Sequence, residues 1–185
     1  MHWSMMAVRG GIGVLLGLAV LLAPGVGLGE LVVLFGIYAL LDGICAVAWA
    51  IHASRRPLDG WPVLLEGVFS IGLGALALGH PFQSMRFVHV VALWGLVTGV
   101  LEILAAGRLA RATAVRWCLA AGGAWSIFLA VFLLGLRHAL TEPLLIAIGV
   151  YALVFGVLVA VAAFRLQRVA VPILMGAVDR TWTTR

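Results

Sequence analysis

Long apolar stretches, separated by short groups of polar, glycine and proline residues, run through the chain from end to end. Each stretch is close to the length of about 20 residues that an α-helix needs to cross a bilayer. Lipid offers no hydrogen bonds to the backbone, and a membrane barrel would alternate apolar and polar positions, so the pattern predicts helices. We predict six spans, over residues 10–24, 30–52, 62–80, 86–107, 117–136 and 141–164.

A hairpin-sized unit recurs three times along these spans, at a spacing of 56 to 57 residues. In each copy an aromatic residue precedes a glycine by five positions and an arginine follows that glycine by twelve, as in Tyr38/Gly43/Arg55, Trp94/Gly99/Arg111 and Tyr151/Gly156/Arg168. Gly11, Gly67 and Gly123 keep the same spacing. Each unit holds two spans, so successive copies enter the bilayer from the same side.

The repeat predicts an all-α, polytopic membrane protein of six transmembrane helices, arranged as three parallel repeated helical hairpins. The repeats are expected at about 8–56, 61–112 and 117–168. Together they form a single six-helix membrane domain over 1–168, followed by a cytoplasmic tail over 169–185. We expect the tail to be flexible or to lie on the inner leaflet, because it is too short for a seventh span.

Small residues recur four positions apart on the predicted helices. This spacing lets helix backbones approach closely in lipid, where no hydrophobic force drives helices together. Packing within one bundle explains the pattern, and dimerisation through one of these faces is the alternative. The predicted helix-packing positions are Gly13, Gly17, Ala39, Gly43, Gly95, Gly99, Ala152 and Gly156.

Composition and charge agree with a membrane protein. The chain is 64% hydrophobic and 10% charged, with a mean hydropathy of +1.20, which excludes an ordinary soluble domain. All twelve basic residues are arginines, and ten lie at the two termini and in the second and fourth loops, against Arg86 and Arg137 elsewhere. They bracket the apolar runs instead of forming one basic face, so we predict a lipid bilayer, and no nucleic acid, as partner. The positive-inside bias predicts cytoplasmic N- and C-termini.

Three acidic residues, Asp42, Glu66 and Glu102, fall inside predicted spans. An ionised, unpaired acid at mid-bilayer costs roughly 2.5–3.5 kcal/mol, so such residues are candidates for function. Thr98 lies one turn before Glu102 on the same helix face and completes a candidate intramembrane polar site. One interpretation makes Asp42 and Glu102 a proton-responsive pair that face each other inside the bundle.

The alternative interpretation, which we favour at this stage, is structural. Asp42 would bond the hydroxyl of Thr98 or Tyr151. Glu66 and Glu102 would pair with an arginine at the cytoplasmic end, the candidates being Arg55, Arg108, Arg111 and Arg116. The repeat supports this view, because the three copies do not keep an acid at any of these positions.

Motifs of enzymes are missing from the sequence. It contains no nucleophile elbow, phosphate loop, zinc-protease motif or dinucleotide fingerprint. Cys45 and Cys118 have no metal-binding spacing. We therefore predict a protein that is not an enzyme, with no catalytic residues, no metal and no cofactor.

Residues 34–43, 64–67, 97–103 and 151–158 carry Asp-Gly and Thr-Gly-x-x-Glu elements in their respective repeats. In these stretches the chain resembles the HdeD family of small bacterial inner-membrane proteins linked to acid resistance. The resemblance implies a protein of the bacterial plasma membrane that supports acid or stress tolerance, or membrane integrity; it implies no catalytic residues. Two alternatives stay open. One is a small transporter or proton-conducting protein that uses Asp42, Glu66 and Glu102; the other is a scaffold subunit of a larger membrane complex, as a homo-oligomer or with another membrane protein.

Overall fold

The computed structural model describes the backbone of residues 3–22, 25, 27–53, 60–79, 84–109, 113–135 and 141–182. It describes side chains over 4–22, 25, 27–52, 60–79, 86–108, 116–135, 143–165 and 167. Over these ranges the chain forms six α-helices, which are α1 (Trp3–Leu22), α2 (Leu28–Ala53), α3 (Trp61–Gly79), α4 (Ser84–Leu109), α5 (Thr113–Gly135) and α6 (Thr141–Trp182). All six are long and apolar enough to span a membrane, as predicted.

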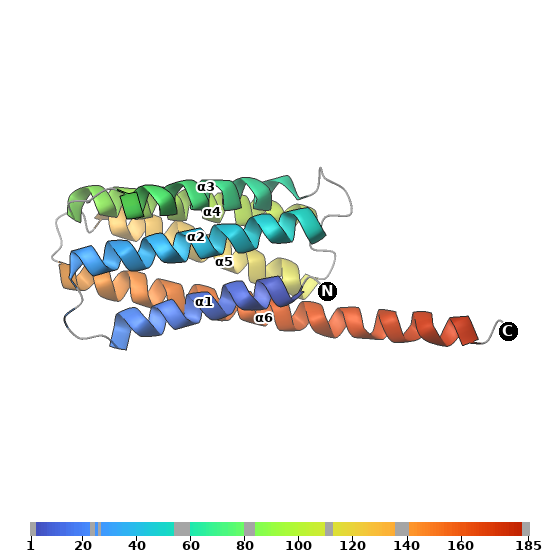
Figure 1. Ribbon diagram of the computed structural model, residues 1–185. Coiled ribbons are helices and arrows are strands. Elements are labelled where there is room, and N and C mark those ends of the chain that lie inside the picture. Colours follow the sequence, from blue (N-terminus) through green and yellow to red (C-terminus); the bar gives the residue numbers. More distant parts are fainter. Residues whose placement is uncertain are drawn as a thin grey trace.

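The six helices run up and down in one bundle, and both chain ends lie at the same end of it (Figure 1). We call this the terminal end and the opposite one the far end. Neighbours in the chain pack against each other, and α1 packs against α6, so the helices form a closed ring. The most extensive interfaces are α1–α6, α2–α3 and α4–α5, which join one predicted hairpin to the next. The contacts within each hairpin are smaller.

Paired glycines explain why the tightest interfaces lie between hairpins. Gly43 faces Gly67 where α2 meets α3, and a Cβ on either glycine would lie within 2.7 Å of the other's carbonyl oxygen. Gly99 and Gly123 repeat this contact between α4 and α5, where both distances would be 2.5 Å. No side chain fits at such a separation, so these pairs set how closely the backbones approach.

The third copy of this contact corrects the predicted repeat register. Between α6 and α1, Gly156 faces Gly10, and a Cβ on either would lie within 2.8 Å of the other's carbonyl oxygen. Gly11, which the sequence aligned with Gly67, has nothing within 4 Å of its Cβ position. The equivalent residues are therefore Gly10, Gly67 and Gly123. Residues in the first helix of repeat one precede their counterparts in repeat two by 57 positions.

The other small residues named from the sequence lie at the same interfaces. A Cβ on Gly17 would meet the Leu153 amide nitrogen at 2.6 Å, and one on Gly13 would lie 3.0 Å from the Gly156 Cα. Gly95 faces the Ser126 carbonyl oxygen. Ala39 and Ala152 are fully buried in the core.

Apolar side chains cover the outside of the bundle as well as its core. Leu15, Val131, Ile146 and many other large hydrophobic residues are exposed. The buried polar and charged residues among those described instead point inward, namely Arg9, Asp42, Glu66, Ser70, Thr98, Glu102 and Ser126. This inversion of the soluble pattern is what a bilayer-embedded bundle requires.

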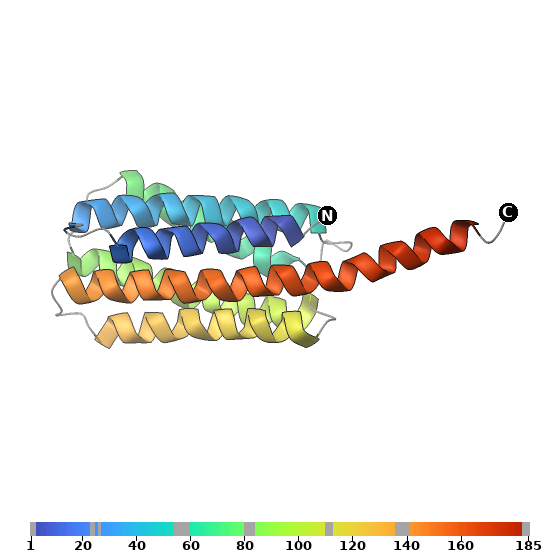
Figure 2. The same cartoon turned by 90° about the horizontal axis from the view of Figure 1, so that it is seen from below.

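Two helix ends differ from the predicted spans. Helix α1 begins at Trp3, seven residues before the predicted start, which places Arg9 inside it. Helix α6 continues as one helix to Trp182, past the predicted domain boundary at 168, and extends beyond the other helices (Figures 1 and 2). The predicted ends followed the apolar run, whereas a helix continues for as long as the backbone propensities allow.

The turn into α2 has its own local signals. Gly25 adopts a left-handed conformation with φ +85°, which glycine accepts without a steric penalty. The Glu30 carboxylate accepts a 2.6 Å hydrogen bond from the Gly27 backbone amide. Glu30 thus caps the start of α2.

Candidate functional site

Four charged side chains from four different helices meet inside the bundle. Arg9 comes from α1, Asp42 from α2, Glu66 from α3 and Glu102 from α4. Their exposed fractions are 8%, 0%, 1% and 2%. We call this group the charge cluster. It unites the three acids that the sequence singled out and adds a guanidinium that the sequence analysis had assigned to the membrane surface.

Arg9 is the centre of the charge cluster. Its Nε donates to Asp42 Oδ1 at 2.5 Å and its Nη2 to Asp42 Oδ2 at 3.2 Å, a bidentate arrangement. The same Nη2 donates to Glu66 Oε1 and lies 3.4 Å from Glu102 Oε1. The guanidinium carbon also sits 5.5 Å from the centre of the Phe155 ring, within cation–π range. Arg9 therefore links α1 to α2, α3, α4 and α6.

The charges in the cluster do not balance. One guanidinium faces three carboxyl groups. Within the described part of the chain, Glu66 Oε2 and both carboxyl oxygens of Glu102 are buried without a hydrogen-bond partner. Buried charges are ordinarily paired and fully hydrogen-bonded, because moving an ion out of water costs several kcal/mol. The cluster can therefore be neutral only when it holds protons.

The repeat explains how the cluster is built. In the corrected register Arg9, Glu66 and Gly122 are equivalent, each directly before a packing glycine; Asp42, Thr98 and Phe155 are equivalent in the same way. These positions face the centre of the ring at one level. A Cβ on Gly122 would lie 3.2 Å from Glu102 Oε2, so the missing side chain leaves room for that carboxyl group. The three repeats thus place different side chains on one shared geometry.

The pairings favoured from the sequence were wrong. Asp42 bonds Arg9, while the Thr98 hydroxyl donates to the Trp94 carbonyl oxygen of its own helix at 2.8 Å. The Tyr151 hydroxyl shares a 2.9 Å hydrogen bond with the Ser126 hydroxyl. A serine and a backbone carbonyl are the nearer partners for these hydroxyls, which leaves Asp42 to the guanidinium.

The arginines expected to neutralise the glutamates also lie elsewhere. The Arg108 guanidinium carbon lies 5.4 Å from the centre of the Trp61 ring, and Arg116 is exposed. Arg55 and Arg111 fall outside the described residues. Glu66 and Glu102 are instead reached by Arg9, because α1 starts early enough to carry that side chain into the bundle.

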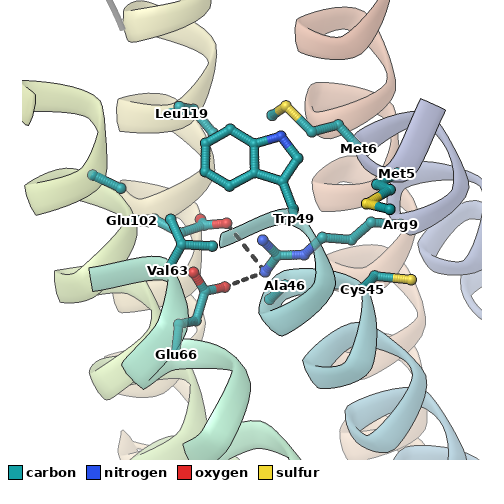
Figure 3. Close-up of a pocket in the computed structure, with 11 residues that line it drawn as sticks. Met5, Met6, Arg9, Cys45, Ala46, Trp49, Val63, Glu66, Glu102 and Leu119 are labelled. Carbon is teal, nitrogen blue, oxygen red and sulfur yellow. Dashed lines mark hydrogen bonds and ion pairs between the residues drawn. The ribbon is translucent and has the colours of Figure 1, made fainter. Parts of the chain in front are cut away.

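A small cavity lies beside the charge cluster, toward the terminal end. It has a volume of about 30 Å³. Figure 3 shows the Arg9 guanidinium pointing toward the carboxylates of Glu66 and Glu102, with the Trp49 indole beside them. The Trp49 ring nitrogen is buried and has no hydrogen-bond partner in the described part of the chain. The full lining is Met5, Met6, Arg9, Cys45, Ala46, Trp49, Val63, Glu66, Glu102, Ala105 and Leu119.

On the other side of the cluster, toward the far end, aromatic rings fill the bundle. Trp94 makes edge-to-face contacts with Phe35, Tyr38 and Tyr151, at centroid distances of 5.5, 5.8 and 5.9 Å. Phe87 meets Phe35 in the same way at 5.5 Å. We call these five residues the aromatic plug. All are at most 3% exposed, so the plug leaves the interior dry on that side.

Hydrogen bonds at the edge of the plug differ between the repeats. The Trp94 ring nitrogen donates to the Ser70 hydroxyl at 2.9 Å, and Tyr151 bonds the equivalent Ser126. The equivalent position in the first repeat is Gly13, which has no hydroxyl. Within the described residues the buried Tyr38 hydroxyl accordingly lacks a partner.

Metal binding has no support in the part of the chain that the structure describes. No group of three or more histidine, cysteine, aspartate or glutamate side chains is arranged there to hold a metal ion. The charge cluster falls short of such a site because Arg9 occupies the space between its carboxyl groups.

Comparison with known proteins identifies the repeat. The family model described as a short repeat of unknown function (DUF308) matches the chain twice, over residues 8–78 and 65–135. The two matches cover more than half of the chain, which therefore belongs to this family. They start 57 residues apart, in agreement with the register that makes Gly10 equivalent to Gly67. No curated protein and no solved structure matches the chain.

Proposed function

We propose that this member of the short-repeat family is a non-enzymatic, multi-pass protein of the bacterial plasma membrane, of the HdeD type, that supports acid or stress tolerance. Its working part is the charge cluster, which binds protons when the surroundings become acidic and releases them when they become neutral. The chain ends lie in the cytoplasm. Arg9 belongs to the interior, and the other arginines keep the positive-inside bias at nine against two.

The observation that carries the proposal is the charge imbalance around Arg9. With all three carboxyl groups ionised, the cluster would carry a net charge of −2 inside an apolar bundle, at a cost of several kcal/mol per unpaired ion. Each proton that the cluster takes up removes one of these charges. The occupancy of a small number of protons thus changes the internal electrostatics of the whole bundle.

Other groups near the cluster do not supply the missing positive charge. Among the described residues, Tyr38 and Cys45 from α2 and Tyr151 from α6 are the additional titratable side chains that interact with it. Helix α5 presents Gly122 at this level. None of these four can act as a second cation opposite the carboxylates.

Binding is better supported than conduction. A conducting path needs a polar route through the bundle, and the aromatic plug fills the interior on the far side of the cluster. The same three acids would serve a transporter only if these rings moved apart. The closed ring of helices, held by glycine contacts at all three major interfaces, favours a bundle that senses protons in place.

Survival of cells in acid tests the proposed function. Cells that lack the gene receive the wild-type chain, Glu102→Gln or Glu30→Gln. The last variant makes the same chemical change at an exposed helix cap, away from the cluster. We expect deletion to lower survival at low pH, and the wild type and Glu30→Gln to restore it while Glu102→Gln does not. Unchanged survival and unchanged membrane permeability after deletion would contradict the proposal.

A further inference from the structure

The cavity beside the charge cluster has the size and the lining of a hydrated site. A water molecule needs about 10–15 Å³ of such volume and two to four polar partners. The cavity has about 30 Å³, enough for about two waters. Glu66 Oε2, both Glu102 oxygens and the Trp49 ring nitrogen offer three acceptors and one donor that no described protein group satisfies. Water in the cavity would satisfy all four.

The position of the cavity gives it a direction. Glu66, Glu102 and Arg9 form its inner wall. Its outer wall consists of residues within about two turns of the helix ends at the terminal end, among them Met5, Trp49 and Ala105. Toward the far end the cluster meets the aromatic plug, in which Phe87 and Trp94 are 0% and 1% exposed. The two sides of the cluster therefore differ sharply in polarity.

We infer that the cavity is a water-filled entry for protons, open to the charge cluster from the terminal end and closed from the far end. The inference rests on the proposed function, since it names the route by which the cluster takes up its protons. In the uptake step, a hydronium ion in the cavity gives one proton to a carboxylate oxygen of Glu102. The products are a carboxylic acid and a neutral water molecule. Release follows the same route in reverse.

This route makes the cluster a sensor of one compartment. With the chain ends in the cytoplasm, protons reach Glu102 when the cytoplasm itself becomes acidic. Acid confined to the outside of the cell leaves the cluster unchanged until it lowers the internal pH. The charged and titratable groups along the route are Arg9, Cys45, Glu66 and Glu102, with Asp42 behind the guanidinium.

Silver ion tests the sidedness of the entry, because it is small, charged and reactive toward thiols. The background variant carries Cys45→Ala and Cys118→Ala. Ala46→Cys and Ala105→Cys then each place one thiol in the cavity wall, and Val91→Cys places the control thiol at the buried level of the plug. Membrane vesicles of both orientations are treated with silver ion. The thiols left unmodified are counted with a maleimide after denaturation, and protease access to a C-terminal tag identifies the vesicles that expose the terminal end.

We expect Ala46→Cys and Ala105→Cys to react at least about tenfold faster when the terminal end faces the silver ion, and Val91→Cys to stay protected from both sides. Protection of both cavity thiols from both sides, or faster reaction from the far end, would overturn the inference. Proton binding by the purified protein is measured separately. A cluster that binds protons but shows either of these contrary silver patterns rejects the entry route alone, whereas a cluster that binds none rejects the proposed function.

Discussion

Arg9 and Glu66 occupy equivalent positions in the first two repeats, yet they carry opposite charges and bond each other across the centre of the bundle. Each residue directly precedes a packing glycine, Gly10 or Gly67, so the two side chains enter the interior at the same level. A repeat that carried an acid in both copies would place two like charges there. The arginine in the first copy turns this repulsion into the strongest polar contact among the helices.

Removal of the guanidinium should destabilise the bundle strongly. Arg9→Met leaves three buried carboxyl groups without a counter-charge, and breaking a buried pair in this way costs about 3–5 kcal/mol. We expect a loss of that size in the free energy of unfolding, measured by denaturant titration in detergent at neutral pH. The loss should shrink as the pH falls, because protonated carboxyl groups no longer need Arg9. Arg116→Met, at an exposed position, serves as the control and should change stability by less than about 0.5 kcal/mol. A loss that stays constant from neutral to acidic pH would speak against the charge account.

The acids should differ in their contributions to stability. Asp42 accepts two hydrogen bonds from Arg9, whereas the oxygens of Glu102 have no hydrogen-bond partner among the described residues. Hydrogen bonds to charged groups contribute about 1.5–3 kcal/mol each, so Asp42→Asn should lower the free energy of unfolding by at least about 1.5 kcal/mol. Glu102→Gln removes one excess negative charge and should leave stability unchanged or raise it. Equal losses in the two variants at neutral pH would contradict the observed hydrogen bonding.

Two adjacent glycines test the corrected register. Gly10→Ala drives a Cβ to 2.6 Å from the Ala160 amide nitrogen, so α1 and α6 must separate; overpacking of this kind costs about 1–3 kcal/mol. Gly11→Ala points into open space and should be tolerated, or stabilise α1 slightly. Thermal unfolding of the two variants side by side gives the comparison. The opposite order would restore the register in which Gly11 is equivalent to Gly67.

The unpaired tyrosine hydroxyl offers another matched pair. Tyr151→Phe removes a hydrogen bond to Ser126 and should cost about 1 kcal/mol. Tyr38→Phe makes the same chemical change at the equivalent position, where the buried hydroxyl has no partner in the described part of the chain, and should be neutral or stabilising. Denaturant titration of both variants decides, and a larger loss for Tyr38→Phe would show that its hydroxyl makes a contact of its own.

The spans and the three acids could be predicted because both follow from local sequence. About 20 apolar residues must form a helix in lipid, and an acid within such a stretch is exceptional wherever its helix packs. The predicted spans agree with the helices apart from the early start of α1 and the late end of α6. Those two ends depend on helix propensity, which an apolar run does not measure.

Arg9 could not be placed from counting charges alone. It lies just before the first apolar run, where an arginine usually marks the cytoplasmic surface, and it was counted there. The spacing held a signal, however, because Pro24 and Pro81 are 57 residues apart. The same spacing applied to the first helix places Arg9 opposite Glu66. The ring closure of α1 against α6 is a tertiary feature, and it decides which residues Arg9 reaches.

Infrared difference spectroscopy of the carboxyl groups, on purified protein in lipid titrated through the neutral and acidic range, tests the central claim most directly. The account predicts an acid-induced carboxylic C=O band from a desolvated group, which shrinks in Glu102→Gln and Glu66→Gln and persists in Glu30→Gln. If the wild-type chain shows no such band, or if both cluster variants leave it unchanged, the charge cluster does not bind protons.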